Sequence, residues 1–376
     1  MTMEASAPKE ATAKAPVTFP CSGCGGPMLF DSEAQNLKCQ YCGREEAIED
    51  SGSQPVEYDL DLSGTDEENA ARTDWGFRKQ TLHCESCGGD IVLPELETAA
   101  ICPFCGSSKV LSQQDTASIK PETVIPFQIS MEQAMASFKT WKSKRWFVPN
   151  AFKNGNIVAR LSGLYIPYWT FDADTDSVYT AERGDYHYRT VTRTRTVNGK
   201  TETYTTQERY TVWHRVGGEY DRWFDDVLVP ASRRYDGKLL EKLNNFDLSK
   251  LKEYRPEYLS GYLAEKYSVP RSEGWQQAKV RIDNAIEVGI KRQIGGDEIR
   301  ALRTRTQYSG LTYKHLLLPI WNAGYTYRGK SYRYMVNAQT GLVSGTVPRS
   351  PWKITIFVLF CLVAVLIVLY FIGQSQ

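Results

Sequence analysis

The chain has 376 residues, of which 41% are apolar and 24% charged, the balance of an ordinary globular protein. This length allows two or three folding units, and the composition excludes a wholly disordered chain. The net charge of +1 conceals an asymmetry: residues 1–120 hold 9 Lys and Arg against 20 Asp and Glu, whereas the rest hold 36 against 24. The acidic front part argues against nucleic-acid binding there, since Lys and Arg supply most of that affinity.

Residues 1–18 lack the apolar stretch of a secretory signal, and we expect them to form a disordered tail. Eight of the nine cysteines follow in four Cys-x-x-Cys pairs. The same spacing occurs twice, which indicates a duplicated module. The ninth, Cys361, lies in the apolar C-terminal tail, where a cysteine behaves as a small apolar residue. The four pairs are Cys21 and Cys24, Cys39 and Cys42, Cys84 and Cys87, and Cys102 and Cys105.

This spacing predicts two zinc ribbons, at residues 19–50 and 78–112. A glycine follows each pair and can adopt the positive φ that closes a tight turn. Four thiolates complete a tetrahedron around Zn²⁺, so we expect two zinc ions per chain and no open position for a catalytic water. A module of about 25 residues buries too little apolar surface to fold alone, so the metal supplies folding energy. The spacing alone leaves iron open as the metal. His83, beside Cys84, is interpreted as an exposed flanking residue rather than a ligand.

Between the ribbons, residues 51–77 form an acidic linker, in which a capping box at 65–68 predicts a short helix. Residues 120–350 are then expected to form a β-rich α+β domain. A helix is predicted over 131–146, and another over 271–293 that ends before two glycines. Three segments share an apolar-Pro-aromatic pattern: Ile125-Pro126-Phe127, Ile166-Pro167-Tyr168-Trp169 and Leu318-Pro319-Ile320-Trp321.

Residues 186–213 predict a long hairpin, because Asn198-Gly199 is a strong type I′ turn signal. A two-residue loop would place Arg195 opposite Glu202 and Arg189 opposite Glu208. Both faces are polar, so the hairpin should project from the domain. It is either a solvated arm or a contact for a partner or lipid headgroups. The second interpretation would use Arg189, Arg193, Arg195, Lys200 and Arg209.

Residues 354–372 are uncharged and long enough for a bilayer core of roughly 30 Å, so we expect a transmembrane helix at 353–373. Arg349, Trp352 and Lys353 precede it, and only uncharged residues follow. The positive-inside rule then predicts a single-pass, tail-anchored protein in the cytoplasmic membrane with its N-terminal domain in the cytoplasm. The complete expectation is an α+β fold with two small β zinc ribbons, a strand-rich α+β domain with a projecting hairpin, and one C-terminal transmembrane helix.

Catalytic and nucleotide-binding motifs are missing from the sequence. Asn198-Gly199-Lys200-Thr201 ends like a phosphate-binding loop but lacks its first glycine. Asp172, Asp174 and Asp176 begin like a calcium loop, yet Ser177 stands where that loop requires glycine. The four histidines are scattered. No catalytic residue, cofactor other than zinc, or small-molecule substrate is therefore predicted, and we expect a protein that is not an enzyme.

The Cys-x-x-Cys-Gly repeats, together with GLYIPYWTFDAD at 163–174 and LPIWNAGYTYRGKSYRYMVNAQTG at 318–341, resemble a bacterial family. These are the transcription-factor-IIB-type double zinc-ribbon membrane proteins, often labelled primosomal protein N′ or replication factor Y helicase-like. The resemblance spans residues 20–372. It implies a membrane-associated scaffold, in some bacteria linked to phage-shock-type, ESCRT-III-like proteins. The sequence lacks a nucleotide-binding loop and gives the helicase label no support.

Two functions follow as hypotheses. The first is a non-enzymatic, membrane-anchored zinc-ribbon adaptor that recruits cytoplasmic proteins to the membrane. The second is a nucleic-acid-binding zinc-ribbon protein linked to replication or transcription, which would use the ribbons or the basic hairpin. The acidic charge of the ribbons favours the first.

Overall fold

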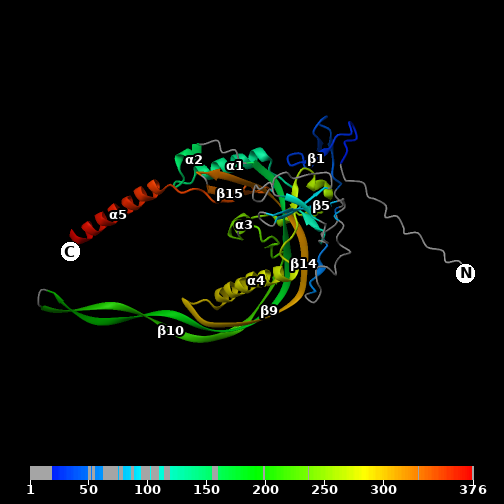
Figure 1. Ribbon diagram of the computed structural model, residues 1–376. Helices are drawn as coiled ribbons and strands as arrows, with labels where there is room; N and C mark the ends of the chain where they lie inside the picture. Colours follow the sequence, from blue (N-terminus) through cyan, green and yellow to red (C-terminus); the bar gives the residue numbers. More distant parts are fainter. Residues whose placement is uncertain are drawn as a thin grey trace.

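A computed structural model shows a mixed α+β protein that is rich in sheet and ends in one long apolar helix (Figure 1). The acidic linker's predicted helix at 65–68 and the predicted tail at 1–18 lie outside the described residues. The structure describes residues 19–49, 52, 56–61, 75, 79–85, 89–94, 102, 110–113, 119–154, 160–197, 200–235, 237–328 and 330–374.

The first cysteine module contains a small antiparallel sheet of three strands in the order β1-β2-β3. The first two strands form a hairpin whose turn ends at Gln35, which has a φ of 56°. Met28, Phe30 and Leu37 alternate with more exposed residues and are buried, so one face of this sheet is apolar. The strands are β1 (Met28–Asp31), β2 (Asn36–Cys39) and β3 (Glu45–Glu46).

Two long strands form the spine of the second, larger sheet. β9 (Arg160–Val197) and β14 (Glu298–Tyr327) pair antiparallel from Arg160–Gly324 to Gly184–Glu298. The register shifts near Ala301 and Gly310, both at positive φ, as expected of β-bulges. These strands curve around α4 in Figure 1.

The larger sheet follows the order β12-β8-β14-β9-β13-β6-β5-β7. β10 and β11 also pair with β9, β4 and β15 with β14, and β16 with β15. Its other strands are β4 (Tyr58–Asp59), β5 (Lys79–Cys84), β6 (Gly89–Pro94), β7 (Val110–Gln113), β8 (Thr123–Val124), β10 (Lys200–Phe224), β11 (Val229–Pro230), β12 (Lys252–Glu253), β13 (Leu263–Glu265), β15 (Lys330–Asn337) and β16 (Val343–Gly345).

The three apolar-Pro-aromatic segments meet in the core. Leu318 of β14 pairs with Ile166 of β9, and the Phe127 ring packs edge-on against Trp321 at 5.1 Å between ring centroids. The indole of Trp321 donates to the carbonyl of Ile129 at 2.8 Å, which satisfies the polar atom of a buried ring. The shared pattern therefore marks neighbouring segments of one core.

Both predicted domain helices are confirmed. Ser130 and Gln133 form a capping box at the start of α1, and Gly295 ends α4 with a φ of 65°. Ile282, Ile286 and Ile290 recur at helical spacing on the buried face of α4. The helices are α1 (Met131–Ser143), α2 (Asn150–Asn154), α3 (Gly237–Leu243), α4 (Arg271–Ile294) and α5 (Pro351–Gln374), with 3-10 turns η2 (Leu248–Lys250) and η3 (Pro256–Leu259).

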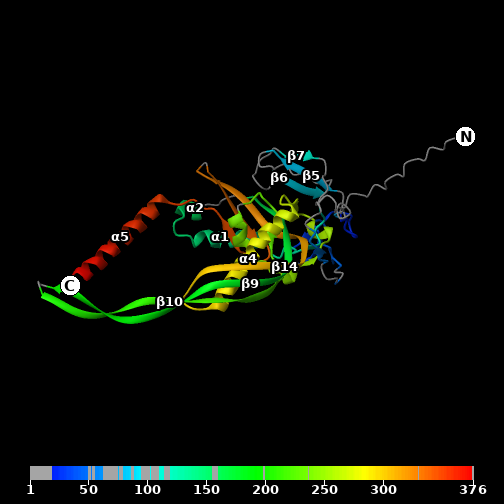
Figure 2. The ribbon, with the colours of Figure 1, turned by 90° about the horizontal axis from the view of Figure 1, so that it is seen from below.

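The predicted hairpin is the outer part of a much longer one. The expected pairs of Arg195 with Glu202 and Arg189 with Glu208 are confirmed, although Asn198 and Gly199 lie outside the described residues. β14 begins opposite Gly184, so beyond that point β9 and β10 form a two-stranded arm. In Figures 1 and 2 this arm and α5 project from the same side of the body.

We expect Ile282→Ala to lower the free energy of unfolding by about 2–5 kcal/mol, because it removes a buried side chain between α4 and the sheet. Val280 lies on the same helix but is 59% exposed. Val280→Ala should therefore change stability by no more than about 0.5 kcal/mol. Urea unfolding of the detergent-solubilised chain, followed by circular dichroism, measures both. Equal losses would contradict the assigned buried face.

Candidate metal centre

The first module folds into two turns of the same geometry. The amide of Cys21 donates to the carbonyl of Gly26, and the amide of Gly25 to the carbonyl of Cys21, both at 2.8 Å. Cys39 and Gly43 repeat this pattern, and Gly25 and Gly43 both have a φ of 73°. This conformation is costly for residues with a Cβ, which confirms the role predicted for these two glycines.

The two turns bring four sulfurs together. The Sγ atoms of Cys21 and Cys42 lie 3.5 Å apart and those of Cys24 and Cys39 3.4 Å apart, and all four fall within 4.8 Å of one another. A tetrahedral zinc site with Zn–S bonds of about 2.3 Å separates its sulfurs by about 3.8 Å. The cluster is therefore compatible with one zinc ion bound by four sulfurs.

Backbone amides and neighbouring sulfurs shift the pKa values of these thiols. Amides of Cys42 and Tyr41 point at the Cys39 sulfur and lower the pKa of its thiol to about 6. The Gly26 amide lowers the pKa of Cys24, but the neighbouring Cys39 and Cys42 sulfurs outweigh it and raise that pKa to about 12. Without a cation the Cys24 sulfur thus retains its proton, and metal binding has to release it.

The second module is described only in part. Cys84, at the end of β5, and Cys102 are both buried. The other two predicted ligands, Cys87 and Cys105, lie outside the described residues, as do Gly88 and Gly106. The described residues therefore show one four-cysteine cluster, and the second zinc site stays a prediction.

The first module is packed onto the large domain. The Phe30 ring lies edge-on to Tyr258 at 5.5 Å between centroids, and its amide donates to the carbonyl of Ser260 at 3.1 Å. The Gln35 amide group reaches across to the Phe127 carbonyl at 2.7 Å. One face of the module is thereby covered. The Tyr41 side chain, in contrast, remains 78% exposed.

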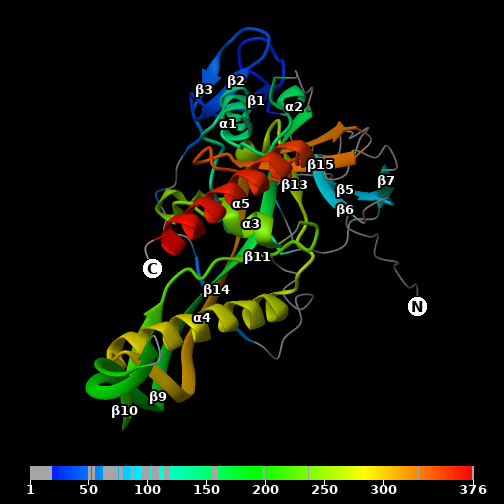
Figure 3. The same cartoon turned by 90° about the vertical axis from the view of Figure 1, so that its left-hand side faces the viewer.

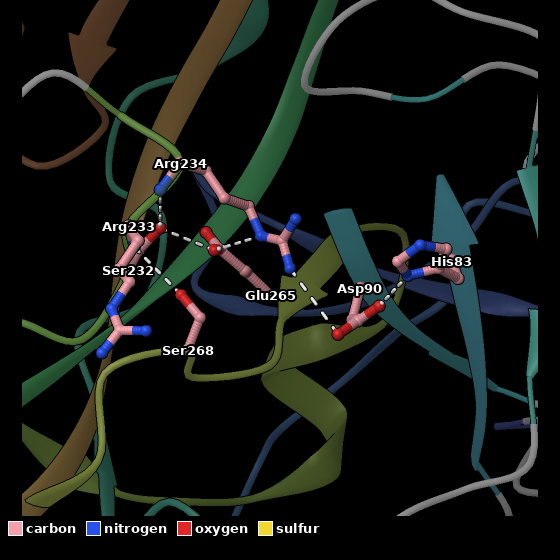
Figure 4. Close-up of polar contacts among 7 residues, drawn as sticks. All are labelled: His83, Asp90, Ser232, Arg233, Arg234, Glu265 and Ser268. Atoms are coloured by element: carbon pink, nitrogen blue, oxygen red, sulfur yellow. Dashed lines mark hydrogen bonds and ion pairs between the residues drawn. The ribbon is translucent and has the colours of Figure 1, made fainter. Parts of the chain in front are cut away.

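The second module joins the domain through the sheet and a polar chain. β6 of the module pairs with β13 of the domain. Beside this pairing, polar contacts run from the second module into the domain (Figure 4). His83 bonds to Asp90 at 2.6 Å, and Arg234 lies 3.7 Å from Asp90 and 2.9 Å from the Glu265 carboxylate. Ser232 donates to Glu265 at 2.6 Å. His83 is thus half-buried and hydrogen-bonded rather than a freely exposed flanking residue.

Glu265 is fully buried, and this burial raises the pKa of its carboxyl to about 7 despite Ser232 and Arg234, which lower it. Neither Glu265 nor Arg234 belongs to a sequence motif, so sequence reasoning missed them.

Sequence reasoning also did not predict that one of the histidines is buried. His315 is completely enclosed, and burial lowers its pKa to about 4, so it is neutral.

A second acidic group lies on the spine. Asp172 comes close to Asp225 and Asp226 rather than to Asp174 and Asp176, the partners that a calcium loop would require. Lys314 places its ammonium 2.8 Å from Asp226 and 2.9 Å from Glu57. Lys314 supplies one positive charge to these carboxyl groups, so the contacts are those of an ion-pair cluster. Glu57 also ties the acidic linker to the domain.

The C-terminal helix is a candidate membrane span. Residues Pro351–Ile372 are long and apolar enough to cross a bilayer, and none of their apolar window is buried against the rest of the chain. A helix that is apolar all round and uncovered differs from an ordinary core helix. By length and composition it satisfies the prediction for 353–373.

Comparison with known proteins finds a distant relative. The chain is 28% identical over 347 residues to YdjG, an uncharacterised protein of Bacillus subtilis strain 168, covering 90% of this chain and 92% of the relative. No family model matches the chain. No solved structure matches it either.

We expect purified full-length protein to contain zinc. Cys39→Ser removes one of four sulfur ligands and should lower bound zinc by one equivalent per chain, as should Cys102→Ser for the second predicted site. Cys361→Ser, on α5, is the matched control and should leave zinc unchanged. Plasma mass spectrometry measures the metal content. Iron in place of zinc, or unchanged zinc in Cys39→Ser, would contradict the assignment.

Glu265 predicts an unusual pH dependence. Its pKa of about 7 in the folded protein exceeds the ordinary 4.5, so between these values the folded state binds the proton more tightly than the unfolded state. Its contribution to stability is therefore greatest below pH 4.5 and declines as the pH rises through about 7. Glu265→Gln cannot ionise. Its free energy of unfolding, relative to that of wild type, should therefore rise by on the order of 2 kcal/mol between pH 5 and pH 8.

Urea unfolding of wild type and Glu265→Gln at both pH values measures this gain. Glu253→Gln, at an exposed position of β12, controls for the loss of one negative charge. If the free energies of unfolding of wild type and Glu265→Gln differ by the same amount at both pH values, the Glu265 carboxyl does not titrate in this range.

Proposed function

We propose that this protein is a non-enzymatic, membrane-anchored adaptor whose zinc ribbons bind a cytoplasmic protein. The observation that carries this proposal is the four-sulfur cluster of Cys21, Cys24, Cys39 and Cys42. All four ligand positions belong to the protein, so a bound zinc ion has no site for water or substrate. Its role is then to hold the shape of the module.

The exposed side of the first ribbon is the proposed docking face. It presents Tyr41 and the exposed Cys24 and Cys42, whereas Phe30 packs on the domain. Residues 19–49 carry five acidic side chains against two basic ones, and a zinc ion with four thiolates adds about −2. An exposed tyrosine in an acidic surrounding favours a protein partner with a basic surface.

The anchor is the second part of the proposal. We propose that α5 spans the cytoplasmic membrane and that Arg349 and Lys353, just before its apolar stretch, keep the domain in the cytoplasm. The family resemblance makes phage-shock-type, ESCRT-III-like proteins the first partners to test, in a role connected with membrane stress.

Nucleic-acid binding has weaker support. Three of the five basic residues on the arm are already engaged, because Arg189 and Arg193 contact Glu208 and Arg195 contacts Glu202. The ribbons themselves are acidic. A gel shift with the full chain at about 50 mM salt tests this alternative, since such affinity rises steeply at low salt.

We expect Tyr41→Ala to reduce partner recovery at least tenfold in cross-linked pull-downs from detergent-solubilised cells, because an exposed aromatic at an interface centre typically dominates affinity. Tyr188→Ala removes a tyrosine of similar exposure from the arm and is the matched control. Cys39→Ser should also lose the partners. A partner set that survives disruption of both ribbons would overturn the adaptor proposal.

A further inference from the structure

The loop between α1 and α2 contacts the first turns of α5. The Trp146 and Phe147 rings both lie edge-on to Phe357, at 5.8 Å and 5.4 Å between ring centroids. The amide of Ser350 donates to the Phe147 carbonyl at 2.7 Å, and the ammonium of Lys353 donates to the Val148 carbonyl at 2.9 Å. The start of α5 is therefore fixed against this loop.

The inference rests on the proposed function, in which α5 crosses a bilayer. In that case these contacts set the depth of the loop in the membrane. Phe357 lies four residues beyond Lys353, which is about 6 Å along the helix axis. It belongs to the apolar candidate span. A ring that touches Phe357 then lies at the boundary between headgroups and acyl chains, whatever the tilt of the helix.

The exposed side chains of the loop suit that boundary. Trp146 is 59% exposed although it is a large aromatic, and Trp352 on α5 is 72% exposed. Lys144 and Arg145 beside Trp146 are also exposed, and the Arg145 guanidinium stacks over the Trp141 ring at 4.0 Å. Tryptophan with flanking basic residues is the side-chain set enriched where proteins meet headgroups.

We propose that residues 144–147, named here the interface loop, insert Trp146 into the headgroup layer of a leaflet that contains anionic phospholipid. Lys144 and Arg145 contact the anionic headgroups. The loop and α5 then form two membrane contacts instead of one, and together they fix how the domain tilts on the bilayer. A single helix joined by the short segment 346–350 would leave that tilt less restricted.

Depth-dependent quenching tests the proposal. The full chain is reconstituted into vesicles of phosphatidylcholine and phosphatidylglycerol, with acyl chains either unmodified or brominated close to the headgroup. Wild type, Trp146→Phe, Trp352→Phe and Trp223→Phe are compared. Trp223, which is 51% exposed on β10, is the matched control. We expect Trp146→Phe and Trp352→Phe each to remove a similar share of the quenchable emission, and Trp223→Phe to remove none.

The outcomes separate this inference from the proposed function. Loss of quenchable emission in Trp352→Phe but not in Trp146→Phe overturns the interface loop and leaves the anchor intact. No loss in either variant refutes the membrane span itself. The preference for anionic lipid is tested by omitting phosphatidylglycerol, which should reduce the Trp146 quenching in wild type but not in Lys144→Glu/Arg145→Glu. Equal quenching with and without phosphatidylglycerol refutes that preference.

Discussion

The rest of the structure depends on the antiparallel pairing of β9 with β14. Most peripheral parts attach to this pair: β8 and β4 join β14, β13 carries the second cysteine module to β9, and β15 leads from β14 towards α5. In Figure 3 the pair runs from the arm, with α4 beside it, towards the small sheet and α1. Because Ile166 and Leu318 pair near its centre, the Pro-aromatic segments form the core where both modules attach.

This arrangement connects the candidate metal centre with the candidate anchor. Cys21 and Cys39 belong to the same buried cluster as Phe138 of α1 and as Val148 and Phe152, which follow the interface loop. Protein interiors are close-packed, so the segments that contribute side chains to such a cluster are held at fixed positions relative to one another. We infer that the exposed face of the first cysteine module stands in a fixed relation to the start of α5.

Local patterns in the sequence predicted the elements but not how they assemble. The cysteine spacing predicted the four-sulfur cluster, and the Asn198-Gly199 turn signal predicted the arm's register, in which Arg195 pairs with Glu202, because short-range geometry determines both. The joining of β6 to β13 and the burial of Glu265 carry no local signal. They depend on pairing between segments far apart in the sequence, which periodicity does not encode.

Two acidic residues of the front part of the chain meet basic residues of the remainder at these joins. Glu57 and Asp90 belong to the acidic front part, and they pair with Lys314 and Arg234 of the basic remainder. Lys314 and Arg234 are largely buried, and burying such groups costs solvation that their partners only partly restore. Apolar contacts would stabilise these joins equally well, but they would also allow the linker and the module to pair with the domain in shifted registers. We infer that the pairs contribute specificity, since a shifted linker would leave Lys314 with Asp226 alone and a shifted module would leave Arg234 with Glu265 alone.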